Sequence, residues 1–208
     1  ENAIRKLPYT TPEYNVEDGE TLLETSEGPM PIEVFGKHNL SNLAGAKWIC
    51  QNMGVDEDDF YEAIATFKGA SKRLEKIAEG TSSIAYKDFA HSPSKVGATT
   101  KAVKEQYPDR KLIACLELHT YSSFNPEFLK EYKGALDAAD EAVIFFLPES
   151  VAIKKLDAVI PEQILEAFHR KDLKIFTDAK SFHGFLENHQ YKNSTLLLMS
   201  SGNYGGFD

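Results

Sequence analysis

Two asparagines offer the first candidate for a binding function. Asn39 and Asn42 lie in residues 36–42 (GKHNLSN), where a segment with helically spaced apolar residues begins. Side chains three residues apart share one face of a helix, so this pair can present amide donors and acceptors together, as an adenine edge would require. The alternative is that Asn39 is a helix N-cap and Asn42 a solvated residue.

A carboxylate and an imidazole stand where a predicted strand ends and a helix begins. Asp88 and His91 belong to residues 88–93 (DFAHSP). The carboxylate could accept hydrogen bonds from ribose hydroxyls, and the imidazole could face a phosphate or a reacting carboxylate. In the alternative interpretation, loop N–H groups satisfy Asp88, and His91 is a surface residue.

Arg73 is the candidate for a charged contact with a nucleotide. It lies in residues 67–75 (FKGASKRLE), next to a predicted domain boundary. A guanidinium in a cleft between domains could bind a nucleotide as a charge-assisted donor. A cluster of charges at a boundary is otherwise a solvated linker.

Two further polar segments follow predicted strands. Residues 118–123 (LHTYSS) carry His119, Thr120, Tyr121 and Ser123, whose side chains can form hydrogen bonds with a substrate. Residues 200–206 (SSGNYGG) follow the last strand and could form a nest of backbone N–H groups. Taken singly, such segments are more often ordinary loops.

The sequence contains no phosphate-binding loop. Neither GxxxxGK followed by Ser or Thr, nor GxGxxG after a strand, occurs in it. Without such a cradle of backbone N–H groups, the chain has no independent means of holding a triphosphate for transfer. No CxxC pair or Cys/His cluster predicts a metal site, and we expect Cys50 and Cys115 to be buried thiols in a reducing compartment.

Alternating strands and helices must position these segments. Continuous apolar runs separated by amphipathic stretches are typical of parallel strands that are covered on both faces. We therefore expect an α/β fold with a Rossmann-like, mostly parallel sheet and helices on both faces, whose ligands bind outside the carboxyl ends of the strands. Strands are predicted at 84–89, 112–116, 142–147, 173–176 and 195–199; helices are predicted to begin near 39, 56, 93, 125, 161 and 178, the second ending at Gly69 and the fourth continuing to Ala139.

Composition narrows the class of partner. The 208 residues carry a formal net charge of −9, which argues against a general nucleic-acid binder. No apolar run approaches the length of about 18 residues that a membrane span needs, and no signal-peptide pattern occurs. We expect a cytoplasmic protein with no nucleic-acid or membrane partner and no obligate protein partner. Because Glu1 replaces an initiating Met, the chain is expected to be an excised fragment.

The candidate segments are more specific in combination than they are singly. GKHNLSN, FKGASKRLE, DFAHSP, LELHTYSS and MSSGNYGG occur in one order and at suitable separations. In this combination the chain resembles the Mur ligase family, from the end of the family's central domain to its C-terminus. The resemblance covers nearly the whole chain from Glu33 on, and it is weakest over residues 1–32 and 150–190.

The resemblance implies a domain organisation. Residues 1–68 would be the incomplete C-terminal part of the central ATP-binding domain, and residues 69–208 would be the C-terminal domain. The family's first domain, which binds the UDP-sugar, and the P-loop half of its central domain would be missing. The chain alone is therefore expected to be inactive.

The resemblance also implies an ATP-dependent, amide-forming reaction of peptidoglycan synthesis, and so a part in cell wall biogenesis, cell shape, the cell cycle and cell division. A carboxylate is phosphorylated by ATP, and an amine then attacks the acyl phosphate. The missing part of the enzyme would hold most of the ATP and the Mg²⁺. Asn39 and Asn42 would contact the adenine, Arg73 and Asp88 the nucleotide, and His91 would lie near the reacting phosphate.

Within the family, MSSGNYGG favours the branch that joins UDP-N-acetylmuramate to the murein tripeptide L-Ala-γ-D-Glu-meso-diaminopimelate in peptidoglycan recycling. His119, Thr120, Tyr121 and Ser123 would face that tripeptide. HTYSS also resembles the loop of relatives that add L-alanine, but Thr120 and Ser123 stand where those relatives have arginines. Two other classes remain as alternatives: a nucleotide- or phosphate-sensing domain without catalysis, and an interaction module whose acidic surface binds a protein.

Overall fold

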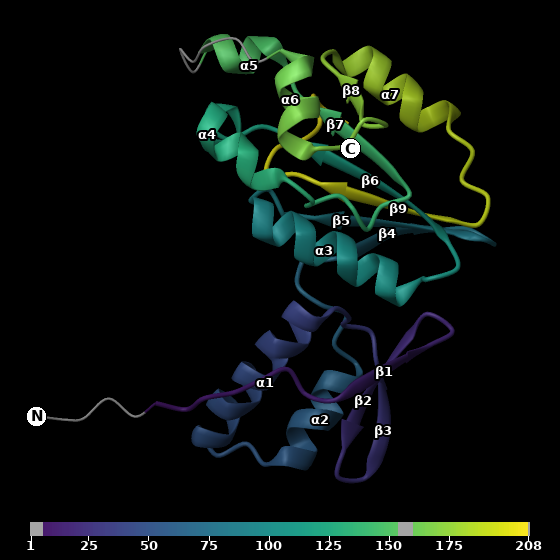
Figure 1. Ribbon diagram of the computed structural model, residues 1–208. Helices are drawn as coiled ribbons and strands as arrows, with labels where there is room; N and C mark the ends of the chain where they lie inside the picture. Colours follow the sequence, from purple (N-terminus) through teal and green to yellow (C-terminus); the bar gives the residue numbers. More distant parts are fainter. Residues whose placement is uncertain (1–5, 154–159, 208) are drawn as a thin grey trace, which may run out of the picture. The chain divides into compact units, whose positions relative to one another are not determined.

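The computed structural model describes residues 6–153 and 160–207 (Figure 1). The chain divides into two compact units, Glu1–Gly69 and Ala70–Asp208. The assignment of these units to particular domains of a larger enzyme stays a prediction. Among the described residues, no helix has both the length and the apolar character needed to cross a membrane.

The first unit combines a small antiparallel sheet with two helices. Its strands β1 (Tyr14–Glu17), β2 (Glu20–Thr25) and β3 (Gly28–Ile32) form one meander. Asp18 and Gly19 both have positive φ, at 51° and 82°, as a two-residue hairpin turn requires. The helices α1 (Lys37–Asn52) and α2 (Glu57–Ala65) complete the unit. Its core consists of Leu23, Ile32, Leu40, Leu43 and Phe60.

The predicted caps of these helices are confirmed in part. The Asp56 carboxylate accepts a hydrogen bond from Asp59 N at 3.0 Å and so caps α2. Gly54 follows the end of α1 with φ of 94°, the conformation in which glycine commonly terminates a helix. The predicted end of the second helix at Gly69 is wrong, because α2 already stops at Ala65.

The second unit is built on one six-stranded sheet with the order β4-β5-β9-β6-β7-β8. Only β4 is antiparallel to its neighbour; the other pairs are parallel. The α/β fold with a mostly parallel sheet is thus confirmed. The strands are β4 (Glu75–Glu79), β5 (Ser83–Asp88), β6 (Lys111–Glu117), β7 (Glu141–Phe145), β8 (Lys174–Phe176) and β9 (Ser194–Met199).

Helices cover both faces of this sheet (Figure 1). Phe182 and Leu186 of α7 pack against Ile113, Cys115 and Phe145 on one face, while α3 lies on the other. Helix α3 begins at Pro93, after Ser92 in an extended conformation, as the sequence predicts. The helical elements are α3 (Pro93–Gln106), η1 (Ser122–Phe124), α4 (Pro126–Leu129), η2 (Lys130–Tyr132), α5 (Pro148–Ile153), α6 (Pro161–Phe168) and α7 (Ala179–Asn188).

The long helix predicted from residue 125 to Ala139 is wrong. The chain forms the single turn α4 and the 3₁₀ turn η2, and then leaves the helical region at Lys133, with ψ of 120°. Gly134 follows with φ of 76°. Leu136 and Ala139 are nevertheless buried, because the irregular chain after η2 still packs its apolar side chains inward.

Candidate functional site

Three of the predicted polar segments meet at one edge of the sheet. Strand β9 lies between β5 and β6, and its last residue, Met199, pairs with Asp88 of β5 and Leu116 of β6. The loops that leave these three strands at residues 88–93, 117–123 and 200–206 are therefore neighbours. This edge is formed by the carboxyl ends of parallel strands, where α/β sheets bind their ligands.

Asp88 is buried at this edge, with 4% of its surface exposed. Its Oδ2 accepts a hydrogen bond from Leu74 N at 2.8 Å, and its Oδ1 accepts one from Ala90 N at 2.7 Å. These are the loop N–H contacts that the alternative interpretation of Asp88 predicts. They join the segment that contains Arg73 to the end of β5, so Asp88 positions this part of the site whether or not it also binds ribose.

Arg73 and His91 gather around one aromatic ring. The Arg73 guanidinium carbon lies 5.3 Å from the centroid of the Phe89 ring, and the His91 ring meets Phe89 edge-on with centroids 5.2 Å apart. His91 Nδ1 is 2.9 Å from Phe89 O. If Nδ1 carries the proton in that contact, Nε2 is left as an acceptor. Arg73 is exposed, so its five donors are accessible to a ligand.

Glu117 is a buried carboxylate that sequence patterns alone did not single out as a site residue. It is 4% exposed, and its Oε2 accepts hydrogen bonds from the Ser200 hydroxyl and, at 3.0 Å, from Tyr204 N. Gly202 N in turn donates to Ser200 Oγ at 2.6 Å. The carboxylate thus fastens the loop after β9 to the end of β6. A single acidic residue within the apolar run LIACLEL was the signal for it.

Tyr204 fastens the same loop to the ends of β6 and β9. It is 1% exposed, and its hydroxyl lies 2.9 Å from Cys115 O and 2.8 Å from Met199 O. Burial raises the pKa of Tyr204 well above its usual value, so the phenol stays protonated as a donor. The hydrogen bonds to Glu117 and those of the Tyr204 hydroxyl together fix residues 200–204.

The four residues that are predicted to bind the acceptor substrate divide into two pairs. His119 and Tyr121 are accessible: the His119 side chain is 44% exposed, with Nδ1 3.9 Å from Glu117 Oε1, and Tyr121 is 64% exposed. The other two use their hydroxyls within the loop. Ser123, 1% exposed, donates to Thr120 O at 2.7 Å, and Thr120 Oγ1 lies 3.1 Å from Ser122 Oγ.

Asn39 and Asn42 lie in α1 of the first unit, so their part in a common site with the second unit stays a prediction. The N-cap of α1 is Gly36; the alternative that Asn39 caps this helix is therefore wrong. Asn39 Nδ2 donates to Phe35 O at 3.0 Å, and Asn42 is exposed. Both belong to the helix, at the three-residue spacing that places them on one face.

Metal ligands do not cluster in the part of the chain that the structure describes. Residues 6–153 and 160–207 contain no group of three or more His, Cys, Asp or Glu side chains that could hold a metal ion. The site edge of the second unit therefore offers hydrogen-bond donors, one guanidinium and two imidazoles, together with two buried carboxylates engaged by the protein itself.

The chain resembles known proteins in sequence and in fold, although no family model matches it. It is 26% identical over 169 residues to UDP-N-acetylmuramate–L-alanine ligase of Desulfitobacterium hafniense, which covers 81% of this chain and 36% of the relative. The structure of UDP-N-acetylmuramate–alanine ligase from Thermotoga maritima aligns with a TM-score of 0.69 and 16% identity, over 92% of this chain and 42% of that protein. The chain is similar to Mur ligases in both sequence and fold.

Further solved Mur ligases are similar to the chain in fold. A murein peptide ligase from Psychrobacter arcticus aligns with a TM-score of 0.59 and 19% identity, over 90% of this chain and 39% of that protein. The MurF ligase of Thermotoga maritima, solved in complex with ADP, aligns with a TM-score of 0.61 and 17% identity, over 92% of this chain and 42% of that one. The chain spans less than half the length of the Mur ligases it matches.

Proposed function

We propose that the chain is the C-terminal part of an ATP-dependent, amide-forming Mur ligase that acts on UDP-N-acetylmuramate in the cytoplasm during cell-wall synthesis. The observation that carries this proposal is the meeting of three polar loops at the carboxyl ends of β5, β9 and β6 in a chain that is similar to Mur ligases. In the reaction, a carboxylate attacks the γ-phosphate of ATP and ADP leaves. The acceptor amine then attacks the acyl phosphate, loses a proton and releases phosphate.

The residues of the second unit would bind and orient the nucleotide. The Arg73 guanidinium, held over Phe89, would stabilise phosphate charge, and His91 would lie near the reacting phosphate. Asn39 and Asn42 would contact the adenine. Mg²⁺, when bound, would neutralise phosphate charge; because the described residues have no cluster that fits a metal, we assign its ligands to another part of the enzyme.

The nucleotide roles can be tested by ATP kinetics in the full-length enzyme. Arg73→Ala should raise the KM for ATP by about 10- to 100-fold, because hydrogen bonds to charged groups contribute about 1.5–3 kcal/mol. Asn39→Ala should raise it by about tenfold or less. Asp88→Ala also deletes the acceptor of Leu74 N and Ala90 N, so its stability must be measured alongside. Wild-type ATP kinetics in all three variants would refute these roles.

The acceptor has two candidates. The absence of arginine at positions 120 and 123, which hold Thr120 and Ser123, favours the murein tripeptide as acceptor, and so a murein peptide ligase. A free amino acid holds its carboxylate beside the reacting amine, where a guanidinium would bind it. A peptide has an amide in that place. Small residues at 200–206 would also let a longer acceptor pass. For L-alanine, we count the names of the curated relatives, several of which are UDP-N-acetylmuramate–L-alanine ligases.

A competition assay separates the two acceptors. The full-length enzyme would receive the tripeptide and L-alanine at equal concentration, with both products quantified. We expect the higher kcat/KM for the tripeptide; a higher value for L-alanine would establish the second candidate. The 208-residue chain alone should release no ADP from ATP, because its sequence has no phosphate-binding loop. Chain-dependent ADP release would contradict that expectation.

A further inference from the structure

A pocket of about 340 Å³ lies in the second unit between α4–η2 and α6. It exists because the chain after α4 does not continue as a helix: at Lys133 and Gly134 it turns away and leaves a concave wall. Helix α6 forms the opposite wall and ends at Phe168, and its C-cap, His169, has a left-handed φ of 53°.

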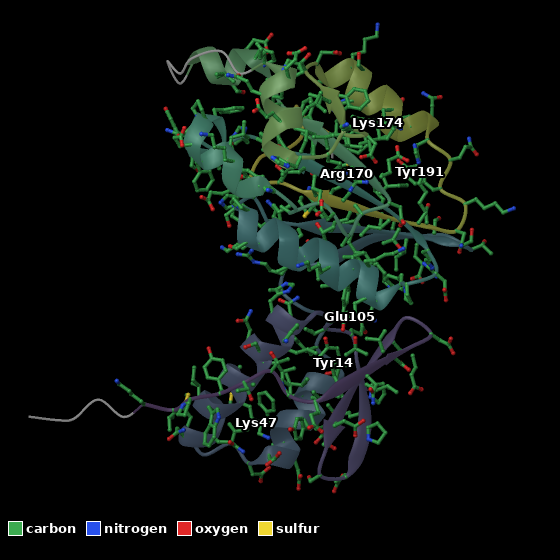
Figure 2. The ribbon with its side chains drawn as sticks, viewed as in Figure 1. Tyr14, Lys47, Glu105, Arg170, Lys174 and Tyr191 are labelled. Atoms are coloured by element: carbon green, nitrogen blue, oxygen red, sulfur yellow. The ribbon has the colours of Figure 1, made fainter. Side chains whose placement is uncertain are left out.

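Arg170 holds the two walls together; its side chain is labelled in Figure 2. Its Nη1 donates to Leu136 O at 2.5 Å, and its other nitrogens bind both carboxylate oxygens of Asp172 at 2.9 and 3.0 Å. The Arg170 side chain is only 12% exposed. A planar guanidinium bound at both ends fixes the spacing of the segments it joins, so the pocket is held open by the fold.

The pocket has an apolar floor and a charged rim. Leu129 and Ala167 of the floor are 3% and 8% exposed. On the rim, Lys133 belongs to the wall after η2 and Glu166 to α6. Within residues 6–153 and 160–207, neither side chain has an ion pair or a hydrogen bond. Of the other polar residues that line the pocket, Lys130 forms an ion pair with Glu127 at 2.7 Å and Gln163 accepts from Ile160 N at 3.1 Å; His169 lines it as well.

This combination selects a class of ligand. A free ammonium on one wall and a free carboxylate on the other complement a group that carries both charges, since a singly charged ligand would leave one rim charge without a partner. The apolar floor suits an aliphatic stem. The matching chemistry is the zwitterionic end of an amino acid on a short hydrocarbon chain.

The pocket is also close to the candidate acceptor loop. The floor begins at Pro126, three residues after Ser123, and reaches Leu129 after one helical turn. Three chain steps of 3.8 Å and one turn of helix give a separation of at most about 17 Å. An extended tripeptide spans about 10 Å along its backbone and further with a long side chain. Free L-alanine cannot reach from the loop to the pocket.

We propose that this pocket binds the distal end of the peptide acceptor, where the diaminopimelate residue carries an ammonium and a carboxylate on an aliphatic stem. Lys133 would bind the carboxylate and Glu166 the ammonium, so both would determine specificity without touching the reacting amine. The inference rests on the proposed ligase function, and it gives a structural reason why a tripeptide would be preferred.

The test compares acceptors of different length in the full-length enzyme. Lys133→Ala and Glu166→Gln should each raise the KM for the tripeptide about tenfold, the scale of one partly solvated charged contact. Neither should change the KM for ATP or for the dipeptide L-Ala-γ-D-Glu, which lacks the distal end. The matched control is Lys192→Ala, an exposed lysine before β9, at the amino ends of the strands.

The outcomes of this test distinguish a wrong pocket assignment from a wrong ligase function. An unchanged tripeptide KM in both variants, an equal rise for the dipeptide, or an enzyme that accepts only L-alanine would each overturn the pocket assignment and leave the ligase function intact. If no acceptor yields an amide, the ligase function fails instead. NMR titration of the 208-residue chain with the tripeptide then decides the pocket: shifts confined to residues around Lys133 and Glu166 support it, and their absence overturns it.

Discussion

Gly202→Ala should destabilise the second unit, because Gly202 is packed against a buried carboxylate. A Cβ at this position would lie 2.7 Å from Glu117 Oε2 and 3.1 Å from its carboxyl carbon. Either the loop moves or the Glu117 carboxylate leaves the Ser200 hydroxyl and Tyr204 N. Overpacking typically costs about 1–3 kcal/mol. Alanine also lowers the conformational entropy of the unfolded chain, which offsets about 0.4–1 kcal/mol of this cost. We therefore expect the free energy of unfolding to fall by about 1–2 kcal/mol.

The assay is urea unfolding of the 208-residue chain with two signals. Far-UV circular dichroism reports on both units, whereas the single tryptophan, Trp48, lies in α1 and reports on the first. Gly202→Ala should lower the far-UV midpoint and leave the Trp48 transition unchanged. Gly184→Ala is the matched control: it lies in α7 with open space around it, and alanine there should stabilise by about 0.5–1 kcal/mol.

The mutual dependence of two residues sharpens this test. In a Glu117→Ala background, Gly202→Ala should cost less than it does alone, since the carboxylate that the new methyl group meets has been removed. The reasoning is refuted if Gly202→Ala is as stable as the unmodified chain, or if its cost is the same in both backgrounds. Either result would mean that the close approach at Gly202 does not constrain the loop.

Three further predictions concern stability. Burial opposes the charge on Glu141, but hydrogen bonds from Lys111 and Lys174 outweigh it and hold the pKa of Glu141 below its usual 4.5; Glu141→Gln should therefore destabilise the chain at pH 7, and urea midpoints of variant and parent should converge as the pH falls below about 4.5. Tyr204→Phe should cost about 1 kcal/mol in thermal unfolding, because the Met199 carbonyl loses its buried donor; an unchanged midpoint would contradict this. Limited proteolysis should cut the first unit before residues 84–147, since that unit has the smaller core; early cuts inside 84–147 would argue otherwise.

Local signals in the sequence were enough to predict most elements of the second unit. Pro93 and Asp178 mark helix starts through effects confined to one turn, and the Asp178 carboxylate does accept from Ser181 N at 2.8 Å. Strand β4 escaped prediction because it is a charged edge strand whose residues are mostly exposed, so it lacks the apolar run that identifies a buried strand. The break after η2 depends on how the following chain packs, which helical periodicity does not report.

The candidate site was predictable at the level of loops and not at the level of side-chain contacts. Because ligands bind at the carboxyl ends of parallel strands, strand order along the chain is enough to predict that the segments of Asp88, His119 and Ser200 share one edge. Strand order could not reveal that Ser123 donates its hydroxyl hydrogen to Thr120 O, or that Glu117 binds the loop after β9. The second of these partners comes from a distant part of the chain, and spacing along the sequence carries no information about it.

The position of β9 has a consequence for how the second unit is made. This strand, Ser194–Met199, lies at the middle of the sheet between β5 and β6. During synthesis, β4-β5 and β6-β7-β8 therefore emerge from the ribosome as two partial sheets with open edges facing one another. Only the last residues of the unit can join them. Folding must wait for a contact of long sequence separation, and a nascent chain stalled before residue 194 would expose two unpaired, apolar strand edges to aggregation.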